Sequence, residues 1–214
     1  ITTAVVRDIV WMYIDEVLEN VVGDDYAAAQ DRISITGSVF TDVKTGEYYA
    51  DAVAWAVKQG VTAGATETTF APYDTCTRAQ TVTFLWRAAG SPAPAAKENP
   101  FTDVKEGAYY YDAVLWAVEN GITGGTSATT FSPNTTVTRA QVVTFLYRAA
   151  KSPAVTGESA FTDVASDAYY EDAVVWAVEN EITDGVNETS FAPAQSCTRA
   201  QIVTFLWRAA GSPE

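Results

Sequence analysis

Hydrophobic residues follow a helical period over most of the chain, in segments that are each a few turns long. Residues 3–22 place their apolar side chains on one stripe, opposite a charged face, which predicts an amphipathic helix that packs on the rest of the protein. Two further helical segments then alternate three times, one after a tyrosine-rich stretch and one after Thr-Arg-Ala-Gln. The pattern predicts an all-α protein built from helix, loop and helix.

The same sequence occurs three times. Phe-Thr-Asp-Val begins each copy, and the arginines of the three Thr-Arg-Ala-Gln motifs are 61 and 60 residues apart. Self-similarity at a fixed period indicates one structural unit whose copies bury their apolar faces against one another. We therefore expect a single cooperative body, with an N-terminal helix and linker at 1–39 and repeats at 40–92, 101–153 and 161–213.

Each repeat carries signals for where its helices begin and end. Residues 77–80 and their two copies fit a capping box, in which the threonine hydroxyl and the glutamine side chain each bind the other's backbone amide. The first helix should end at Gly60 and at Gly121, because glycine readily adopts the left-handed conformation that closes many helices. Repeat 3 departs from this rule with Glu181. Thr-x-Gly and Phe-x-Pro turns then lead to the second helix.

The arginine at the start of each second helix is unexpected, because a cation there faces the positive end of the helix dipole. It could form a structural salt bridge, for instance to the aspartate of Phe-Thr-Asp-Val. Alternatively, the guanidinium and the free amides of the first turn could bind a carboxylate or phosphate, with a glycine loop letting the ligand approach the backbone. The residues concerned are Arg78, Arg139 and Arg199, with Gly64, Gly125 and Gly185 in the loops.

Tryptophans recur at two positions of the repeat. Aromatic residues at helical spacing usually belong to the core, and we expect this of Trp86 and Trp207. A second use, as an aromatic wall against a sugar, competes with the core role for Trp55, Trp116 and Trp176.

Composition excludes several classes of function. The formal charge of −14 argues against nucleic acid and anionic membrane as partners, so an anionic ligand would need a local cationic site. The chain has no histidine, the commonest general base and metal ligand, and its acidic residues lack the spacing of a calcium loop. We expect no metal and no cofactor. No apolar run approaches the roughly 20 residues of a membrane span, and the start at Ile1 indicates a processed protein or an excised fragment.

The two cysteines, Cys76 and Cys197, occupy the same repeat position, where repeat 2 has Val137. A residue that exchanges with valine behaves as a small buried hydrophobe, so we expect two unpaired thiols. A disulfide would need Cα atoms within roughly 7 Å. Closure of repeat 3 onto repeat 1 would permit that distance.

The motifs, taken in order, resemble the S-layer homology domain. They are Phe-x-Asp-Val, Gly-Ile-Thr-x-Gly, Phe-x-Pro and Thr-Arg-Ala-[Glu/Gln], and the resemblance covers residues 40–214 in three copies. It implies three helix-loop-helix repeats in a pseudo-threefold bundle, located outside the cell at a bacterial wall or S-layer, that bind secondary cell-wall polysaccharide. In the family a pyruvylated sugar is typically held in grooves between repeats, with the motif arginine engaging its carboxylate. This role falls on Arg78, Arg139 and Arg199, and more loosely on the loop glycines.

Two other function classes remain open. The conspicuous acidic residues recur in every repeat, whereas an active site is usually unique, so we expect no catalysis by a carboxylate pair. The alternative to glycan binding is a protein-binding or self-assembling surface module with exposed tyrosines as anchors. Other surface-layer proteins would then be its partners.

The three loops differ in charge. Repeat 2 has Gly124 beside its loop glycine, whereas repeat 3 has Glu181 and Asp184 in the corresponding loop. Because like charges repel, we expect an anionic sugar to bind best at the loop of repeat 2 and weakly or not at all at repeat 3. Replacing Arg139 by alanine should weaken glycan binding and leave folding largely intact. The sequence does not say which arginine completes which loop.

Overall fold

The computed structural model describes residues 40–95 and 98–213. The helix predicted for residues 3–22 lies outside this part of the chain. As predicted, the described residues form helices, with no strand longer than an isolated bridge, and none of these helices has the length and hydrophobicity to cross a membrane. The helices are α3 (Ala50–Lys58), α4 (Arg78–Ala88), α5 (Tyr111–Glu119), α6 (Arg139–Ala149), α7 (Glu171–Glu179) and α8 (Arg199–Ala209).

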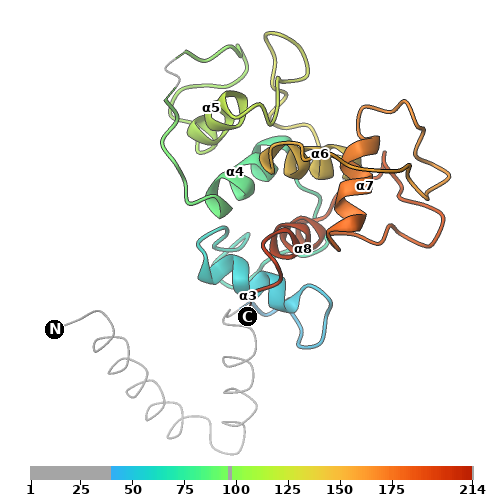
Figure 1. Ribbon diagram of the computed structural model, residues 1–214. Helices are drawn as coiled ribbons and strands as arrows, with labels where there is room; N and C mark the ends of the chain where they lie inside the picture. Colours follow the sequence, from blue (N-terminus) through green and yellow to red (C-terminus); the bar gives the residue numbers. More distant parts are fainter. Residues whose placement is uncertain (1–39, 96–97, 214) are drawn as a thin grey trace, which may run out of the picture.

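The three second helices, α4, α6 and α8, meet at the centre of the molecule (Figure 1). The void between their apolar faces measures only ≈10 Å³, so these faces are closely packed. This is the shared core that the sequence predicted. Its lining includes Leu85, Val142, Leu146, Ile202 and Leu206.

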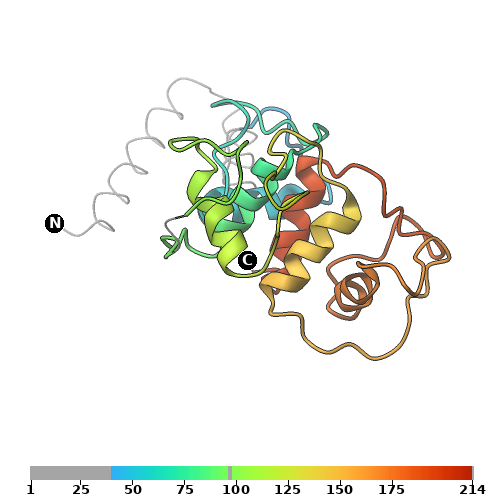
Figure 2. The same cartoon turned by 90° about the horizontal axis from the view of Figure 1, so that it is seen from above.

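The first helix of each repeat packs on the second helix of the preceding repeat. Helix α5 lies on α4, α7 lies on α6, and α3 of repeat 1 lies on α8 of repeat 3. The last contact closes the chain into a circle. Figure 2 shows α6 and α8 side by side, with α7 seen almost end-on beyond them. The packed unit in space is therefore a helix pair drawn from two repeats, and not the repeat of the sequence.

The helix ends follow the signals in the sequence. Gly60 and Gly121 have left-handed φ angles of 70° and 69°. Glu181 adopts the same conformation, with a φ of 57°. Its Cβ makes this left-handed conformation energetically less favourable than it is for glycine. All three capping boxes are confirmed, with N-caps at Thr77, Thr138 and Thr198.

Backbone hydrogen bonds tie the three repeats together around the axis. The amide of Cys76 donates to the carbonyl of Cys197, that of Cys197 to Val137, and that of Val137 to Cys76. Both cysteines are buried free thiols, as their exchange with valine predicted. Burial raises the pKa of each thiol to about 12, so both remain in the unreactive protonated form.

Candidate ligand-binding grooves

Each motif arginine reaches across to the following repeat. Its Nε–H donates to the carbonyl oxygen of the phenylalanine in that repeat's Phe-x-Pro turn. The three side chains are between 2% and 6% exposed, so these bonds lie inside the protein. The pairs are Arg78 with Phe131 at 2.9 Å, Arg139 with Phe191 at 2.8 Å, and Arg199 with Phe70 at 2.7 Å. The third pair joins repeat 3 to repeat 1 and completes the circle.

Aromatic rings enclose the guanidinium groups. Arg139 lies 4.8 Å from the ring centre of Phe191 and 5.5 Å from that of Phe205, both in the following repeat. Arg78 and Arg199 make the equivalent contacts. Burial lowers the pKa of Arg78 and of Arg139, yet an arginine in a protein stays charged. The guanidinium group therefore joins neighbouring repeats in two ways, by stacking on aromatic rings and by donating a hydrogen bond to a carbonyl.

The amides of the first helical turn are not free, which corrects the expectation that they help to bind an anion. The amide of Arg139 donates to the carbonyl of Gln195 at 2.8 Å, and that of Ala140 donates to Pro193 at 3.1 Å. The same two bonds recur at the starts of α4 and α8. Because the carbonyls belong to the following repeat, they satisfy the helix end and offset the positive pole that made the arginine unexpected.

The aspartate of Phe-Thr-Asp-Val also has a different partner from the one expected. Asp42 accepts hydrogen bonds from the amides of Phe70 at 2.8 Å and Ala71 at 2.7 Å, and repeats 2 and 3 do the same. Ala71 has a left-handed φ of 56°, so the carboxylate holds a strained turn. Among the described residues no motif arginine forms a salt bridge with these aspartates. The salt-bridge interpretation is therefore wrong.

The loop glycines are required by packing within the protein. A Cβ on Gly125, whose φ is 87°, would lie 2.5 Å from the ring of Phe101 and 2.5 Å from the carbonyl oxygen of Thr130. Gly64 and Gly185 have equivalent surroundings. The phenylalanine of Phe-Thr-Asp-Val thus fills the space under each loop, so these glycines have a structural reason that is independent of any ligand.

Gly125→Ala is expected to lower the free energy of unfolding by about 2 to 4 kcal/mol, because the methyl group meets a ring and a carbonyl while the left-handed φ disfavours alanine. Urea unfolding followed by circular dichroism measures the change. Gly124→Ala is the matched control, since nothing lies within 4 Å of a Cβ there, and it should cost less than about 0.5 kcal/mol. Equal losses in the two variants would contradict the packing argument.

One surface groove brings together parts of all three repeats. It has a volume of ≈380 Å³ and is formed by the loop and second helix of repeat 3, Arg139 of repeat 2 and Tyr48 of repeat 1. Thr183 and Gly185 of the loop lie on its wall. We call it site 3, after the repeat that supplies the loop, and so the structure assigns Arg139 to the loop of repeat 3.

The other two interfaces carry the same groups, and we call them site 1 and site 2. In both, burial raises the pKa of the first tyrosine of the tyrosine-rich stretch, and nearby arginine charges lower it. Each site thus takes its loop, its motif arginine and its tyrosine from three different repeats. Site 1 combines the loop of repeat 1 with Arg199 of repeat 3 and Tyr109 of repeat 2, and Arg87 lies near this tyrosine. Site 2 combines the loop of repeat 2 with Arg78 of repeat 1 and Tyr169 of repeat 3, and Arg148 lies near this tyrosine.

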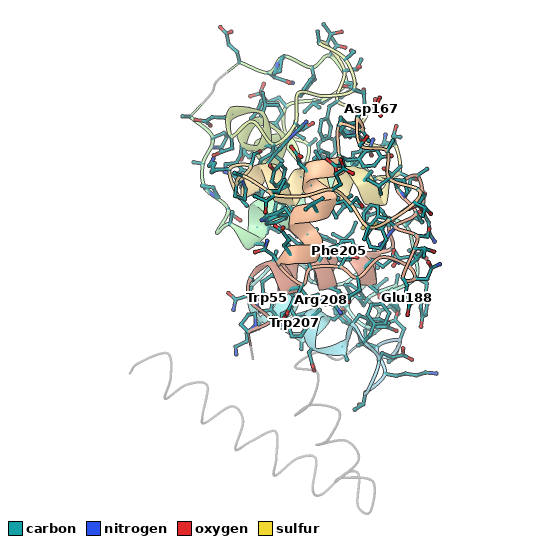
Figure 3. All side chains as sticks on the ribbon, turned by 45° about the vertical axis from the view of Figure 1, so that its right-hand side comes forward. Trp55, Asp167, Glu188, Phe205, Trp207 and Arg208 are labelled. Atoms are coloured by element: carbon teal, nitrogen blue, oxygen red, sulfur yellow. The ribbon has the colours of Figure 1, made fainter. Side chains whose placement is uncertain are left out.

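Each site contains a second arginine that the sequence analysis missed. Arg208 lines site 3 and donates from Nη1 to the carbonyl of Ile182 at 3.3 Å, and Arg87 and Arg148 make the same bond in their repeats. Figure 3 places Arg208 near Phe205 on α8. The signal was the arginine near the end of every second helix, which recurs with the period of the repeat. These helix-end arginines are less buried than the motif arginines, with Arg208 32% exposed.

Site 3 differs from the others in charge. Asp184 Oδ2 lies 3.8 Å from Arg208 Nη1, and the aspartate side chain is 87% exposed. Repeats 1 and 2 have Ala63 and Gly124 at this position. Residues 40–95 and 98–213 contain no group of three or more histidine, cysteine or acidic side chains arranged to hold a metal ion. The additional carboxylate of site 3, that of Asp184, therefore forms an ion pair with Arg208 and is not part of a metal-binding acidic cluster.

Arg199 carries a buried donor without a partner. Its Nη2 makes no hydrogen bond among the described residues, whereas Nη2 of Arg78 and of Arg139 donates to the threonine of the facing loop at 3.4 Å. A buried donor that lacks an acceptor is destabilising. The interface at site 1 therefore has one hydrogen bond fewer than those at sites 2 and 3.

The tryptophans proposed as a sugar wall are buried, which favours the core role. Their side chains are 8% to 9% exposed, and Trp176 packs on the ring of Tyr147 at 5.7 Å. Figure 3 shows Trp55 of α3 near Trp207 of α8, in keeping with the packing of these helices. Trp86 and Trp207 lie against the core and remain partly exposed. The buried set comprises Trp55, Trp116 and Trp176.

A known sequence family matches the chain three times. The profile of the S-layer homology domain aligns with residues 39–82, 100–143 and 160–203. These segments contain all four recurring motifs up to the first turn of each second helix. Together they cover more than half of the chain.

Individual bacterial proteins are also similar to the chain. It is 36% identical over 114 residues to the surface-layer 125 kDa protein of Lysinibacillus sphaericus, which covers 53% of the chain and 9% of that protein. It is 32% identical over 181 residues to an endoglucanase of Bacillus sp. strain KSM-635, covering 80% and 19%, and 33% identical over 121 residues to a cell surface protein of Thermoanaerobacter kivui, covering 54% and 16%. The chain spans less than a fifth of the length of each.

Proposed function

Because the chain belongs to the S-layer homology domain family, whose members are cell-surface anchoring modules, we propose that it binds secondary cell-wall polysaccharide and thereby holds an attached protein on the wall. The sugar that it recognises is anionic, with a pyruvylated sugar as the expected form. The binding positions are the three sites between repeats.

The observation that carries this proposal is the presence of two guanidinium groups at each site on a strongly acidic protein. Arg139 and Arg208 both line site 3, although the chain has a formal charge of −14. Charge-assisted hydrogen bonds from arginine to a carboxylate are stronger than neutral ones. We assign the direct contact with the carboxylate to the more exposed helix-end arginine. The buried motif arginine contributes positive potential and holds the facing loop in place.

The three sites should bind an anionic sugar unequally, with site 2 the tightest and site 3 weak or silent. Site 2 presents an uncharged loop, whereas at site 3 Asp184 already faces Arg208 and repels a second carboxylate. Titration calorimetry with a pyruvylated wall-glycan fragment should give fewer than three strong sites. The variant Glu181→Gly/Asp184→Gly should gain a site or bind roughly fivefold more tightly, as about 1 kcal/mol of repulsion implies. Three equal sites in the parent protein would contradict this ranking.

A protein-binding or self-assembling module is the alternative function, and a competition experiment separates the two. Exposed tyrosines favour the alternative, since Tyr48, Tyr109 and Tyr169 are between 57% and 65% exposed, and tyrosine is enriched at interface anchors. Free pyruvylated glycan should release the protein from purified cell walls. Retention on walls stripped of polysaccharide would instead favour the protein-binding function.

We assign no catalytic activity to this chain. Its conspicuous carboxylates are repeated, and those of the Phe-Thr-Asp-Val motifs accept hydrogen bonds from backbone amides, as Asp42 does. The similarity to an endoglucanase covers only 19% of that protein, so it transfers no activity. Release of reducing ends from wall glycan by the purified chain would overturn this assignment.

A further inference from the structure

The tyrosines beside site 3 differ from those beside the other two sites. Tyr73 follows the Phe-x-Pro turn of repeat 1, whereas repeats 2 and 3 have Asn134 and Ala194 at the same place. Tyr73 is 68% exposed. It packs edge-on against Tyr49 with ring centres 6.1 Å apart, and the two hydroxyl oxygens are 3.4 Å apart. The repeated sequence therefore adds a large, accessible aromatic ring in repeat 1 alone.

Tyr48 continues this aromatic surface into site 3. Like Tyr73, Tyr48 packs its ring edge-on against Tyr49, with ring centres 5.1 Å apart. It also lines the groove together with Arg139. Burial raises the pKa of Tyr48, and its interaction with Tyr73 raises it further, which agrees with the closeness of the two side chains. Because Tyr49 is only 1% exposed, it is a fixed support for both. We call Tyr48 and Tyr73 the tyrosine shelf.

The shelf and the groove beside it suit an uncharged sugar. Aromatic faces pack on the C–H surface of a pyranose, and tyrosine hydroxyls exchange hydrogen bonds with its hydroxyl groups. The exposed carboxylate of Asp184 repels an anion, but it accepts hydrogen bonds from neutral hydroxyls. Arg208 and Gln201, which also line the groove, supply donors. The features that disfavour a pyruvylated sugar at site 3 are thus compatible with a neutral one.

We propose that site 3 and the tyrosine shelf together bind an uncharged pyranose unit of the wall polysaccharide, while sites 1 and 2 bind its anionic units. The inference rests on the proposed polysaccharide binding. The occupant follows from continuity, because Tyr48 belongs to both the groove and the shelf, and a polysaccharide extends beyond a groove of ≈380 Å³. The three sites would then recognise different sugar units of a single polymer.

The test uses one wall-glycan fragment in two forms, intact and after mild acid has hydrolysed its pyruvate ketals. Titration of the parent protein with the pyruvate-free form should show binding. Tyr73→Ala should weaken that binding about two- to tenfold, the effect of losing one aromatic contact. Tyr73→Phe keeps the ring and should change it less than about twofold. The affinity of sites 1 and 2 for the intact form should be the same in all three proteins.

Two further measurements separate the possible outcomes. Thermal unfolding of each variant checks the fold, since Tyr73→Ala also uncovers Tyr49. Tyr109→Ala, beside site 1, should weaken binding of the intact form and leave the pyruvate-free form unchanged. If the parent does not bind the pyruvate-free form, or if Tyr73→Ala binds it as tightly as the parent does, the inference is wrong. If the parent does not bind the intact form, the proposed function itself fails.

Discussion

Removal of residues 155–214 is expected to unfold the rest of the chain in one cooperative transition. The truncation deletes α7 and α8, so α6 loses the helix that packs on it and α3 loses its support. Arg139 loses the carbonyl and both rings that enclose it. A domain of this size is stable by only about 5 to 15 kcal/mol, and breaking two of three helix pairings exceeds that reserve. Far-ultraviolet circular dichroism and limited proteolysis would record the loss.

Adding residues 155–214 back as a separate chain controls for this truncation. Every contact that closes the circle would again be available, so the mixture should regain helicity and protease resistance at sufficient concentration. Repeat proteins that are stabilised only by nearest neighbours along the chain shorten without collapsing. A two-repeat fragment that is stable and native-like would show that this chain behaves in that way, and that its closure is dispensable.

Arg78→Ala is expected to weaken the tightest glycan site and to lower the free energy of unfolding by about 2 to 4 kcal/mol. The side chain holds repeat 2 through the carbonyl of Phe131 and through stacking on two rings, and losing a buried charge-assisted bond and a cation–π contact costs this much. At site 2 Arg78 contributes positive potential without touching the ligand, so its loss should weaken binding of a pyruvylated fragment by about 1 kcal/mol. Urea unfolding and titration calorimetry measure the two effects separately.

Arg139→Ala is the matched control, because Arg139 makes the same structural contacts but serves site 3. It should lose a similar amount of stability and retain the tight binding of the anionic fragment. This revises the expectation that Arg139→Ala spares folding and weakens binding, which did not anticipate the burial of the side chain. If both variants lose affinity equally, the loss reflects damage to the fold, and the motif arginine has no role toward the ligand.

Local features of this chain were predictable from sequence because each depends on residues close together along it. The capping boxes join a threonine to a glutamine three residues later, and Gly60 ends its helix through its own φ angle. The burial of Cys76 and Cys197 followed from the exchange with Val137. The family profile and the helical core agree with what the repeated motifs implied.

The partners of the motif arginines were not predictable in the same way. The sequence pattern indicated two candidate partners, an aspartate of Phe-Thr-Asp-Val and an external anion. It could not indicate a backbone carbonyl, because every residue has one. The hydrogen bonds of the helix-start amides were not predictable either, because their acceptors are backbone carbonyls of another repeat. The helix-end arginines were visible as a repeated residue but had no known neighbour until the loops were placed.

The amino-acid sequence was enough to show three copies of one helical unit, the bounds of most of their helices and an acidic third loop. The three-dimensional fold was needed to show that the first helix of each repeat packs on the second helix of the preceding one, that repeat 3 closes onto repeat 1, and that Arg78, Arg139 and Arg199 serve sites 2, 3 and 1. The reason is physical. Helix signals act over a few residues, whereas Arg199 and Phe70 are 129 residues apart and meet only because burial of all three apolar faces requires a closed circle.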